Sequence, residues 1–217
     1  MSGEATRRAP FVAVLALRGD DGSGDAAVPP GVDPDEFRLA LLEDTYETAA
    51  GLDLVTPALV LDPPDQPDVE AITWPGTPII RAGTPAGAFA ALHALGATEA
   101  VLLAGDAPDL PGLHVGKLLR ALGRAPASAC RADGGGLVAL AARLPLPGWL
   151  DGVLRDVDLD VPDALERLRA AAPRPGLVPQ GPAWHRLRTP ADLARLDPGL
   201  EGWDNTRALL EGRPLTG

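Results

Sequence analysis

Short apolar runs alternate with helical segments along most of this chain. The segments 11–17 and 99–104 are almost entirely apolar, and each is followed, after a loop, by a segment with the caps and spacing of a helix. Strands of a parallel sheet carry such runs because helices cover both of their faces. We therefore expect an α/β fold, a single domain with three layers, α/β/α, around a mainly parallel, mixed sheet. The expected strands are 11–17, 58–61, 78–81, 99–104, 128–131, 137–142 and 184–187, and the expected helices are 34–50, 84–96, 112–122, 161–172, 190–196 and one within 200–217.

Length and composition predict one domain with its own core. The chain has 217 residues, of which 46% are hydrophobic and 23% charged, close to the average of globular proteins. No linker long enough to separate two domains is visible. We expect a single domain over 1–217, with a core at about 11–197 and a C-terminal helical tail at 198–217.

The charge and the single cysteine restrict the partners and the compartment. A formal net charge of -11 repels phosphate backbones, so nucleic-acid binding is not expected. Cys130 has no second cysteine to pair with, which fits a reducing, cytoplasmic location. The apolar run 11–17 is too short to cross a membrane, so no membrane role is expected.

The strongest local signal for chemistry lies directly after the strand 99–104. The chain there reads Gly-Asp-Ala-Pro-Asp, with carboxylates at Asp106 and Asp109. In open α/β sheets, ligands bind beyond the carboxyl ends of the strands, and a carboxylate in that place can hold Mg²⁺. Alternatively, Asp106 or Asp109 simply caps the following helix.

Four motifs in order resemble nucleotidyltransferases of the glycosyltransferase-A type. This group includes molybdenum cofactor guanylyltransferases, phospholactate guanylyltransferases and uncharacterised bacterial glycosyltransferase-like proteins. The run Val-Leu-Leu-Ala-Gly-Asp-Ala-Pro-Asp-Leu-Pro at 101–111 is similar to their metal-binding strand end, and Asp-Gly-Gly at 133–135 to their glycine turn. Arg-Thr-Pro-Ala-Asp-Leu at 188–193 is similar to a late Asp-Thr-Pro-Glu-Asp-Leu segment, and Asp-Asn-Thr-Arg at 204–207 loosely to the phospholactate branch. The resemblance implies a nucleotide-diphospho-sugar transferase-like fold.

The resemblance also implies roles for particular residues. Asp106 would bind Mg²⁺ or Mn²⁺, and Asp109 would be a catalytic neighbour able to share that task. Gly134 and Gly135 would let the backbone approach the acceptor or a phosphate, although a tight turn that needs positive φ explains them equally well.

A second phosphate-binding element is expected before the helix 84–96. Gly83 and Thr84 would present the N-terminus of this helix to the substrate, with Arg81 nearby as a cation for the anion. The alternative is an ordinary threonine cap followed by proline in the first turn.

The first loop departs from the family. Related enzymes hold the triphosphate with a glycine-rich loop that carries Lys or Arg. Here the candidate phosphate-binding residues Arg18 and Gly19 begin a loop, 18–25, with three Asp against one Arg. Such a loop repels a nucleotide unless a divalent ion lies between them, and the alternative is an ordinary solvated, flexible loop.

The late segment departs as well, because the family has carboxylates where this chain has His-Arg-Leu-Arg at 185–188. An Arg roughly 6 Å from Mg²⁺ costs on the order of 5 kcal/mol at an effective dielectric constant of about 20. Arg186 and Arg188 could instead bind a phosphate directly, or lie on a solvent-facing strand edge.

These observations lead to one expected function and two alternatives. The expected function is transfer of a nucleotidyl group from a nucleoside triphosphate to a small phosphorylated or hydroxyl acceptor. The alternatives are sugar transfer from a nucleotide sugar, and a binding or scaffold protein that kept the fold and lost catalysis. The expected partners are a nucleotide or nucleotide sugar and a small-molecule acceptor, and an apolar patch in the C-terminal third could make a homodimer.

Overall fold

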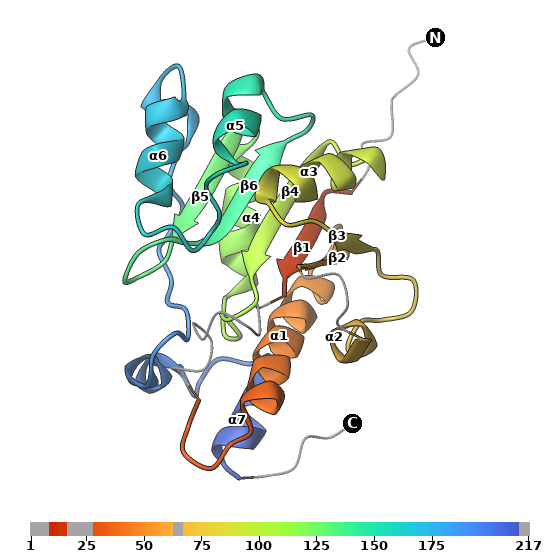
Figure 1. Ribbon diagram of the computed structural model, residues 1–217, viewed down its shortest axis with the longest axis vertical. Helices are drawn as coiled ribbons and strands as arrows, with labels where there is room; N and C mark the ends of the chain where they lie inside the picture. The colour runs from red at the N-terminus through yellow and green to blue at the C-terminus, as the bar shows by residue number, and fades with distance from the viewer. Residues whose placement is uncertain (1–8, 17–27, 63–66, 213–217) are drawn as a thin grey trace.

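A six-stranded mixed sheet runs through the centre of the protein (Figure 1). The computed structural model describes residues 9–16, 28–62 and 67–212. The strand order is β3-β2-β1-β4-β6-β5, in which β1, β2, β3 and β4 are mutually parallel and β6 runs antiparallel to both β4 and β5. The strands are β1 (Phe11–Leu15), β2 (Thr56–Leu61), β3 (Ile79–Arg81), β4 (Glu99–Ala104), β5 (Ala127–Arg131) and β6 (Leu137–Arg143). The expected mainly parallel, mixed sheet is confirmed.

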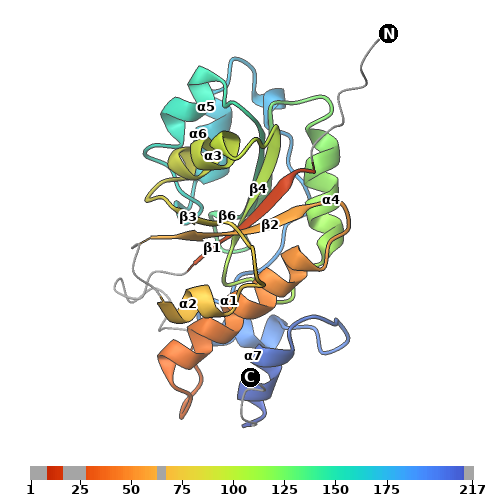
Figure 2. The same cartoon turned by 90° about the vertical axis from the view of Figure 1, so that its right-hand side faces the viewer.

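Helices cover both faces of the sheet, which gives the expected three layers (Figure 2). Successive side chains of β1 point to opposite faces, so Ala13 packs with the helices α3, α5 and α6, whereas Val12 and Val14 pack with α1 and α4. Both strand faces are therefore buried, which explains the continuous apolar runs. The helices are α1 (Pro34–Ala50), α2 (Pro67–Ala71), α3 (Pro85–Ala94), α4 (Gly112–Ala121), α5 (Gly148–Val153), α6 (Ala164–Ala171) and α7 (Asp204–Leu210), with 3₁₀ turns at Pro175–Leu177 and Pro190–Arg195.

The long helix α1 connects the sheet to the C-terminal part of the chain. Asp33 caps its N-terminus by accepting hydrogen bonds from two backbone N–H groups, as the capping pattern predicts. Phe37 and Leu41 on α1 pack against Leu187 and Trp203 in a third, smaller apolar cluster. This cluster holds the C-terminal segment across the carboxyl ends of the strands.

The segment 184–187 is not a strand, contrary to expectation. It forms one isolated bridge, between Trp184 and Ala132, and then leaves the sheet. The N–H of Leu187 donates to the carbonyl of Asp106 just beyond β4, at 2.8 Å, so the segment crosses the end of the sheet and does not extend it. The short helices α2 and α5 were also not predicted from the sequence.

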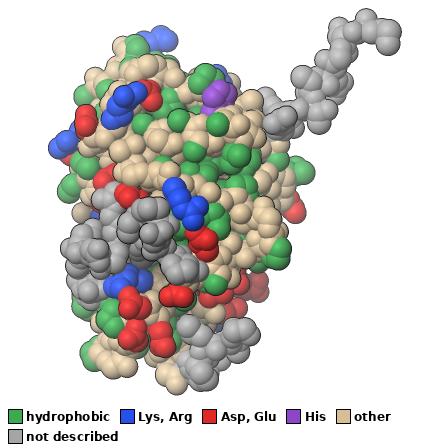
Figure 3. Space-filling model, turned by 45° about the vertical axis from the view of Figure 1, so that its right-hand side comes forward, with side chains coloured by type: hydrophobic (Ala, Val, Ile, Leu, Met, Phe, Trp, Pro, Cys, Tyr) green, Lys and Arg blue, Asp and Glu red, His purple; other side chains and the backbone are tan. Residues whose placement is uncertain are grey.

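The surface reflects the acidic composition. On the face shown in Figure 3, acidic side chains gather mainly in the lower half. Among the described residues, no helix combines the length and the apolar composition that crossing a bilayer requires.

Candidate active site

A cavity of about 290 Å³ opens at the carboxyl ends of the parallel strands. It is lined by the residues that end β1, β2 and β4 and by two loops that are distant in sequence. Ligands bind at this edge in open α/β sheets because the loops there diverge. Its charged lining residues are Asp62, Asp106, Asp158, Asp160, Arg186 and Arg188.

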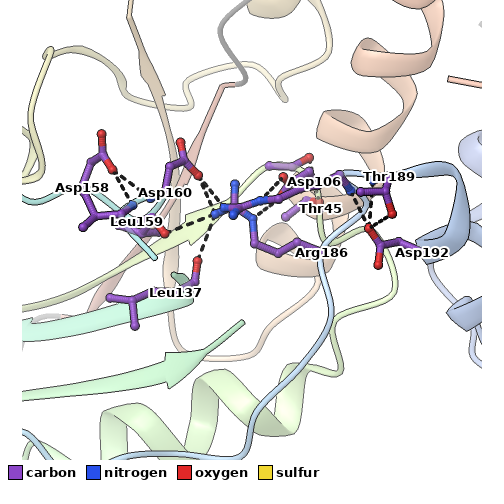
Figure 4. Close-up of polar contacts among 12 residues, drawn as sticks. Thr45, Asp106, Leu137, Asp158, Leu159, Asp160, Arg186, Thr189 and Asp192 are labelled. Carbon is purple, nitrogen blue, oxygen red and sulfur yellow. Dashed lines mark hydrogen bonds and ion pairs between the residues drawn. The ribbon is translucent and has the colours of Figure 1, made fainter. Parts of the chain in front are cut away.

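Asp106 follows β4 and is paired with Arg186. The Nε of Arg186 donates to Oδ1 of Asp106 at 2.5 Å, and both side chains are almost completely buried. Arg186 also donates from Nη1 to the carbonyls of Leu137 and Leu159, at 3.1 and 3.4 Å. Figure 4 shows the guanidinium group of Arg186 between Asp106 and the loop 158–160. Arg186 is thus held as a fixed structural cation that neutralises Asp106.

Arg188 lies beside this pair and is more exposed. Its Nε is 3.6 Å from Oδ2 of Asp106, and its side chain is 29% exposed, against 4% for Arg186. Burial, followed by the neighbouring charge of Arg186, lowers the pKa of Arg188. Burial also lowers the pKa of Arg186, but the charges of Asp106 and Asp160 outweigh it and the net shift is upward. Arg188 is therefore the more exposed of the two arginines that line the cavity.

Asp160 bridges the two arginines from the cavity side. Its Oδ1 lies 2.7 Å from Nη1 of Arg186 and 2.6 Å from Nη2 of Arg188. Its side chain is 65% exposed, so one oxygen atom joins a buried and a half-buried guanidinium group at the edge of the solvent. The four side chains Asp106, Asp160, Arg186 and Arg188 together carry no net formal charge.

The glycine turn between β5 and β6 positions the loop that carries Asp160. Gly134, Gly135 and Gly136 all have positive φ, which confirms the tight-turn interpretation. Gly136 donates to the carbonyl of Pro162 at 2.9 Å, and a Cβ on Gly136 would lie 2.5 Å from the carbonyl oxygen of Leu159. Gly134 and Gly135 do not line the cavity. The close approach that Gly135 and Gly136 permit is to the protein's own loop, at Pro162 and Leu159, and the expected role of Gly134 and Gly135 in phosphate binding stays a prediction.

Asp109 also lies outside the cavity lining. Its buried Oδ1 accepts a hydrogen bond from Nε1 of Trp184 at 3.1 Å and lies 3.0 Å from Nε2 of His185. These contacts anchor the start of the segment that carries Arg186 and Arg188. The geometry gives Asp109 structural contacts, and its expected catalytic role stays a prediction.

The start of α3 forms part of the cavity wall and is poorly suited to bind an anion. Gly83 and Thr84 line the cavity, whereas Arg81 does not, and it pairs with Glu70. Thr84 caps α3 by accepting a hydrogen bond from the N–H of Gly87 at 3.1 Å, as the alternative interpretation predicts. The N–H of Ala86 donates to the carbonyl of Leu154, so the N–H groups of this first turn are already engaged.

The other two expected phosphate-binding residues, Arg18 and Gly19, lie outside the described residues. Asp62, Asp158 and Asp160 were not expected in the site. The sequence signal for the last two is weak: two aspartates, separated by one residue, shortly before a helix. Such a pattern is typical of an ordinary turn.

The residues around Asp106 do not fit a divalent cation. Its Oδ1 accepts from Arg186, and Arg188 lies near its Oδ2. In the parts of the chain that the structure describes, no group of three or more His, Cys, Asp or Glu side chains could hold a metal ion. Mg²⁺ demands near-octahedral oxygen coordination, and two adjacent guanidinium groups repel it. The expected Mg²⁺ or Mn²⁺ at Asp106 therefore lacks a ligand set among these residues.

Comparison with known proteins identifies the fold. No protein-family model matches the sequence, and no curated protein matches it. A nucleotide-diphospho-sugar transferase-like protein from Desulfovibrio desulfuricans matches with a TM-score of 0.71 and 17% identity over 94% of each chain. A 4-diphosphocytidyl-2C-methyl-D-erythritol synthase from Anaerococcus prevotii has a TM-score of 0.60 and 14% identity over 93% of this chain and 96% of that chain.

A third solved structure contains a nucleotide. It is a CMP:2-keto-3-deoxy-manno-octonic acid synthetase complexed with CTP, with a TM-score of 0.53 and 16% identity over 94% of this chain and 99% of that chain. At such identities the likeness is one of fold, and fold alone does not define an activity. The nucleotide-diphospho-sugar transferase-like fold expected from the motifs is confirmed.

Proposed function

We propose that this protein is a nucleotidyltransferase-like transferase whose cavity binds the phosphates of a nucleoside triphosphate. The observation that carries the proposal is the half-buried Arg188 beside Asp106, in a cavity at the carboxyl ends of the parallel strands. Guanidinium groups bind phosphate oxygens in a bidentate manner, so Arg188 supplies the recognition that this site needs. The fold, which one nucleotide-bound synthetase shares, agrees with this use.

In the proposed reaction, an oxygen atom of a small phosphorylated or hydroxyl acceptor attacks the α-phosphorus of the triphosphate. A new phosphorus–oxygen bond forms, the bond between the α-phosphorus and the oxygen bridging to the β-phosphate breaks, and pyrophosphate leaves with the electron pair. Where the acceptor is a hydroxyl group, its proton passes to solvent. Arg188 would neutralise negative charge on the phosphate oxygens, and the Asp106–Arg186 pair would keep Arg188 in place. Mg²⁺ or Mn²⁺, expected from the resemblance, stays a prediction. The same cavity would also suit the diphosphate of a nucleotide sugar.

A second candidate function is ligand binding without catalysis. It is favoured by one observation, the engagement of Asp106 by Arg186, which occupies a carboxylate oxygen that a catalytic metal ion would need. A nucleotide would then be bound through Arg188 and released unchanged. Both candidates share the ligand and differ only in turnover.

The test measures binding and turnover separately. A panel of nucleoside triphosphates and nucleotide sugars is screened by thermal shift with and without Mg²⁺ or Mn²⁺, and pyrophosphate release is followed for every nucleotide that binds. We expect at least one nucleotide to raise Tm. Arg188→Gln should weaken its binding at least about tenfold, because a hydrogen bond to a charged group contributes about 1.5–3 kcal/mol.

The matched control is Arg155→Gln, which removes an arginine that pairs with Asp151 on α5 and does not line the cavity. It should bind like the wild type. Binding without pyrophosphate release, across a panel of sugar-phosphate and hydroxyl acceptors, would favour the non-catalytic candidate. No stabilisation by any nucleotide would contradict both candidates.

A further inference from the structure

The carboxylate of Asp160 has the contacts that a bound phosphate oxygen would have. One atom, Oδ1, lies 2.7 Å from Arg186 and 2.6 Å from Arg188. These are the lengths of charge-assisted bonds between nitrogen and an anionic oxygen. All three residues line the same cavity, so this position is accessible to a ligand in it.

Backbone hydrogen bonds hold the loop that carries the carboxylate of Asp160. Asp158 accepts hydrogen bonds on Oδ1 from the N–H groups of Asp160 and Val161, at 2.8 and 3.1 Å. Leu137 donates to the carbonyl of Leu159 at 2.8 Å, which ties the same turn to β6. The backbone of the turn is therefore fixed independently of the contacts that the Asp160 side chain makes.

Exchange of this carboxylate for another anion is energetically accessible. The Asp160 side chain is 65% exposed, and ion pairs with an exposed partner contribute little to stability because water and salt compete for them. Arg186 would keep Asp106 and two backbone carbonyls as partners after Asp160 moved away. Arg188 would keep Asp106 nearby. Neither guanidinium group would be left buried and unsatisfied.

We propose that Arg186 and Arg188 form a phosphate subsite, that Asp160 occupies it as a competing internal anion, and that a phosphate or diphosphate group of the ligand binds by displacing Asp160. This proposal rests on the proposed function for the identity of the ligand, but the exchange itself can be tested with an inorganic anion and without any nucleotide. Asp160 thereby sets the affinity of the site for anions. A monoanionic competitor is displaced best by a ligand of higher charge, so the subsite favours diphosphate and triphosphate groups over singly charged anions.

The experiment uses inorganic pyrophosphate as the probe, because it needs neither a particular base nor a particular acceptor. Its Kd is measured by calorimetry in buffer freed of divalent cations, for the wild type and Asp160→Asn. The variant keeps the shape of the side chain and leaves the four-residue cluster with one net positive charge. We expect it to bind pyrophosphate about fivefold more tightly or better, the effect of one unit charge about 4 Å away at the dielectric constant of water.

Asp158→Asn is the matched control within the same cavity. It removes the same charge from the same turn, but this carboxylate caps the backbone and does not bridge the arginines. We expect a smaller gain than for Asp160→Asn. Adding Arg188→Gln to Asp160→Asn should abolish the gain. Where Asp160→Asn yields too little folded protein, Asp160→Ser gives the same comparison.

Unchanged or weaker binding of pyrophosphate by the Asp160 variants would overturn the proposed exchange. An equal gain in Asp158→Asn would overturn it as well, because the loss of any negative charge near the cavity would then explain the tighter binding. Failure of the proposed function has a different signature. In that case no nucleoside triphosphate yields pyrophosphate, while the gain of Asp160→Asn for inorganic pyrophosphate persists.

Discussion

At the scale of single residues, the three consecutive glycines of the β5–β6 turn differ in what a side chain would meet. Gly134 and Gly136 have φ of +88° and +78°. Nothing lies within 4 Å of a Cβ built on Gly134, whereas a Cβ on Gly136 would meet the carbonyl oxygen of Leu159 at 2.5 Å. The two positions therefore separate the cost of the left-handed backbone from the cost of displacing the loop that carries Asp160.

We expect Gly134→Ala to lower the free energy of unfolding by about 1 kcal/mol, since an alanine in this conformation costs roughly 1–2 kcal/mol. Gly136→Ala should cost about 2–4 kcal/mol, because it also disturbs the backbone hydrogen bonds to Leu159 and Pro162. Urea unfolding measures both values. Equal losses in the two variants would mean that the loop can move away freely.

At the scale of elements, apolar periodicity predicted the strands and longer helices of the sheet well, because burial on both faces leaves continuous apolar runs. It failed at 184–187, where a similar short run lies over the end of the sheet. Trp184 and Leu187 are apolar there because Trp184 packs against the core cluster between the sheet and α4, and Leu187 packs against α1, although the segment forms no strand. The helices α2 and α5 span only five and six residues, which is too short to show a helical periodicity in the sequence.

The contact between α1 and α7 includes one buried acid. Asp44 on α1 is fully buried and accepts hydrogen bonds from the N–H groups of Asn205 and Thr206 at the start of α7. Burial raises the pKa of Asp44 from its ordinary value of 3.8 to about 6, although the hydrogen bonds from Thr206 and Asn205 act in the opposite direction. The folded protein thus binds a proton at Asp44 more tightly than the unfolded chain does.

Stability from Asp44 should therefore be greatest below pH 4 and be lost as the pH rises to about 6. Relative to Asp44→Asn, which stays neutral throughout, the free energy of unfolding of the wild type should fall by roughly 3 kcal/mol across this window. Urea unfolding of both proteins at pH 4 and pH 7 gives the difference, with all other titrating groups shared. A difference that does not change with pH would contradict the raised pKa.

At the scale of the whole molecule, only part of the site was predictable. Asp106 was placed correctly at the rim of the sheet, because a strand followed by a polar loop defines that rim. The departure at Arg186 and Arg188 was also visible in the sequence. Their pairing with Asp160 was not, because three loops meet there and no local pattern records which carboxylate reaches which guanidinium group.

The overall charge leads to a prediction about kinetics. The formal charge of -11 repels an incoming nucleotide over long distances, whereas Arg188 attracts it only at contact. Raising the ionic strength from 0.01 to 0.15 M shortens the Debye length from about 30 to about 8 Å, which screens the distant repulsion more than the contact. We therefore expect the association rate constant of a bound nucleotide, measured by stopped flow, to rise over this range. The dissociation rate constant should change less, because it depends mainly on the contacts with Arg186 and Arg188. A falling association rate constant would show that local positive charge steers the ligand, and that the acidic surface does not govern its approach.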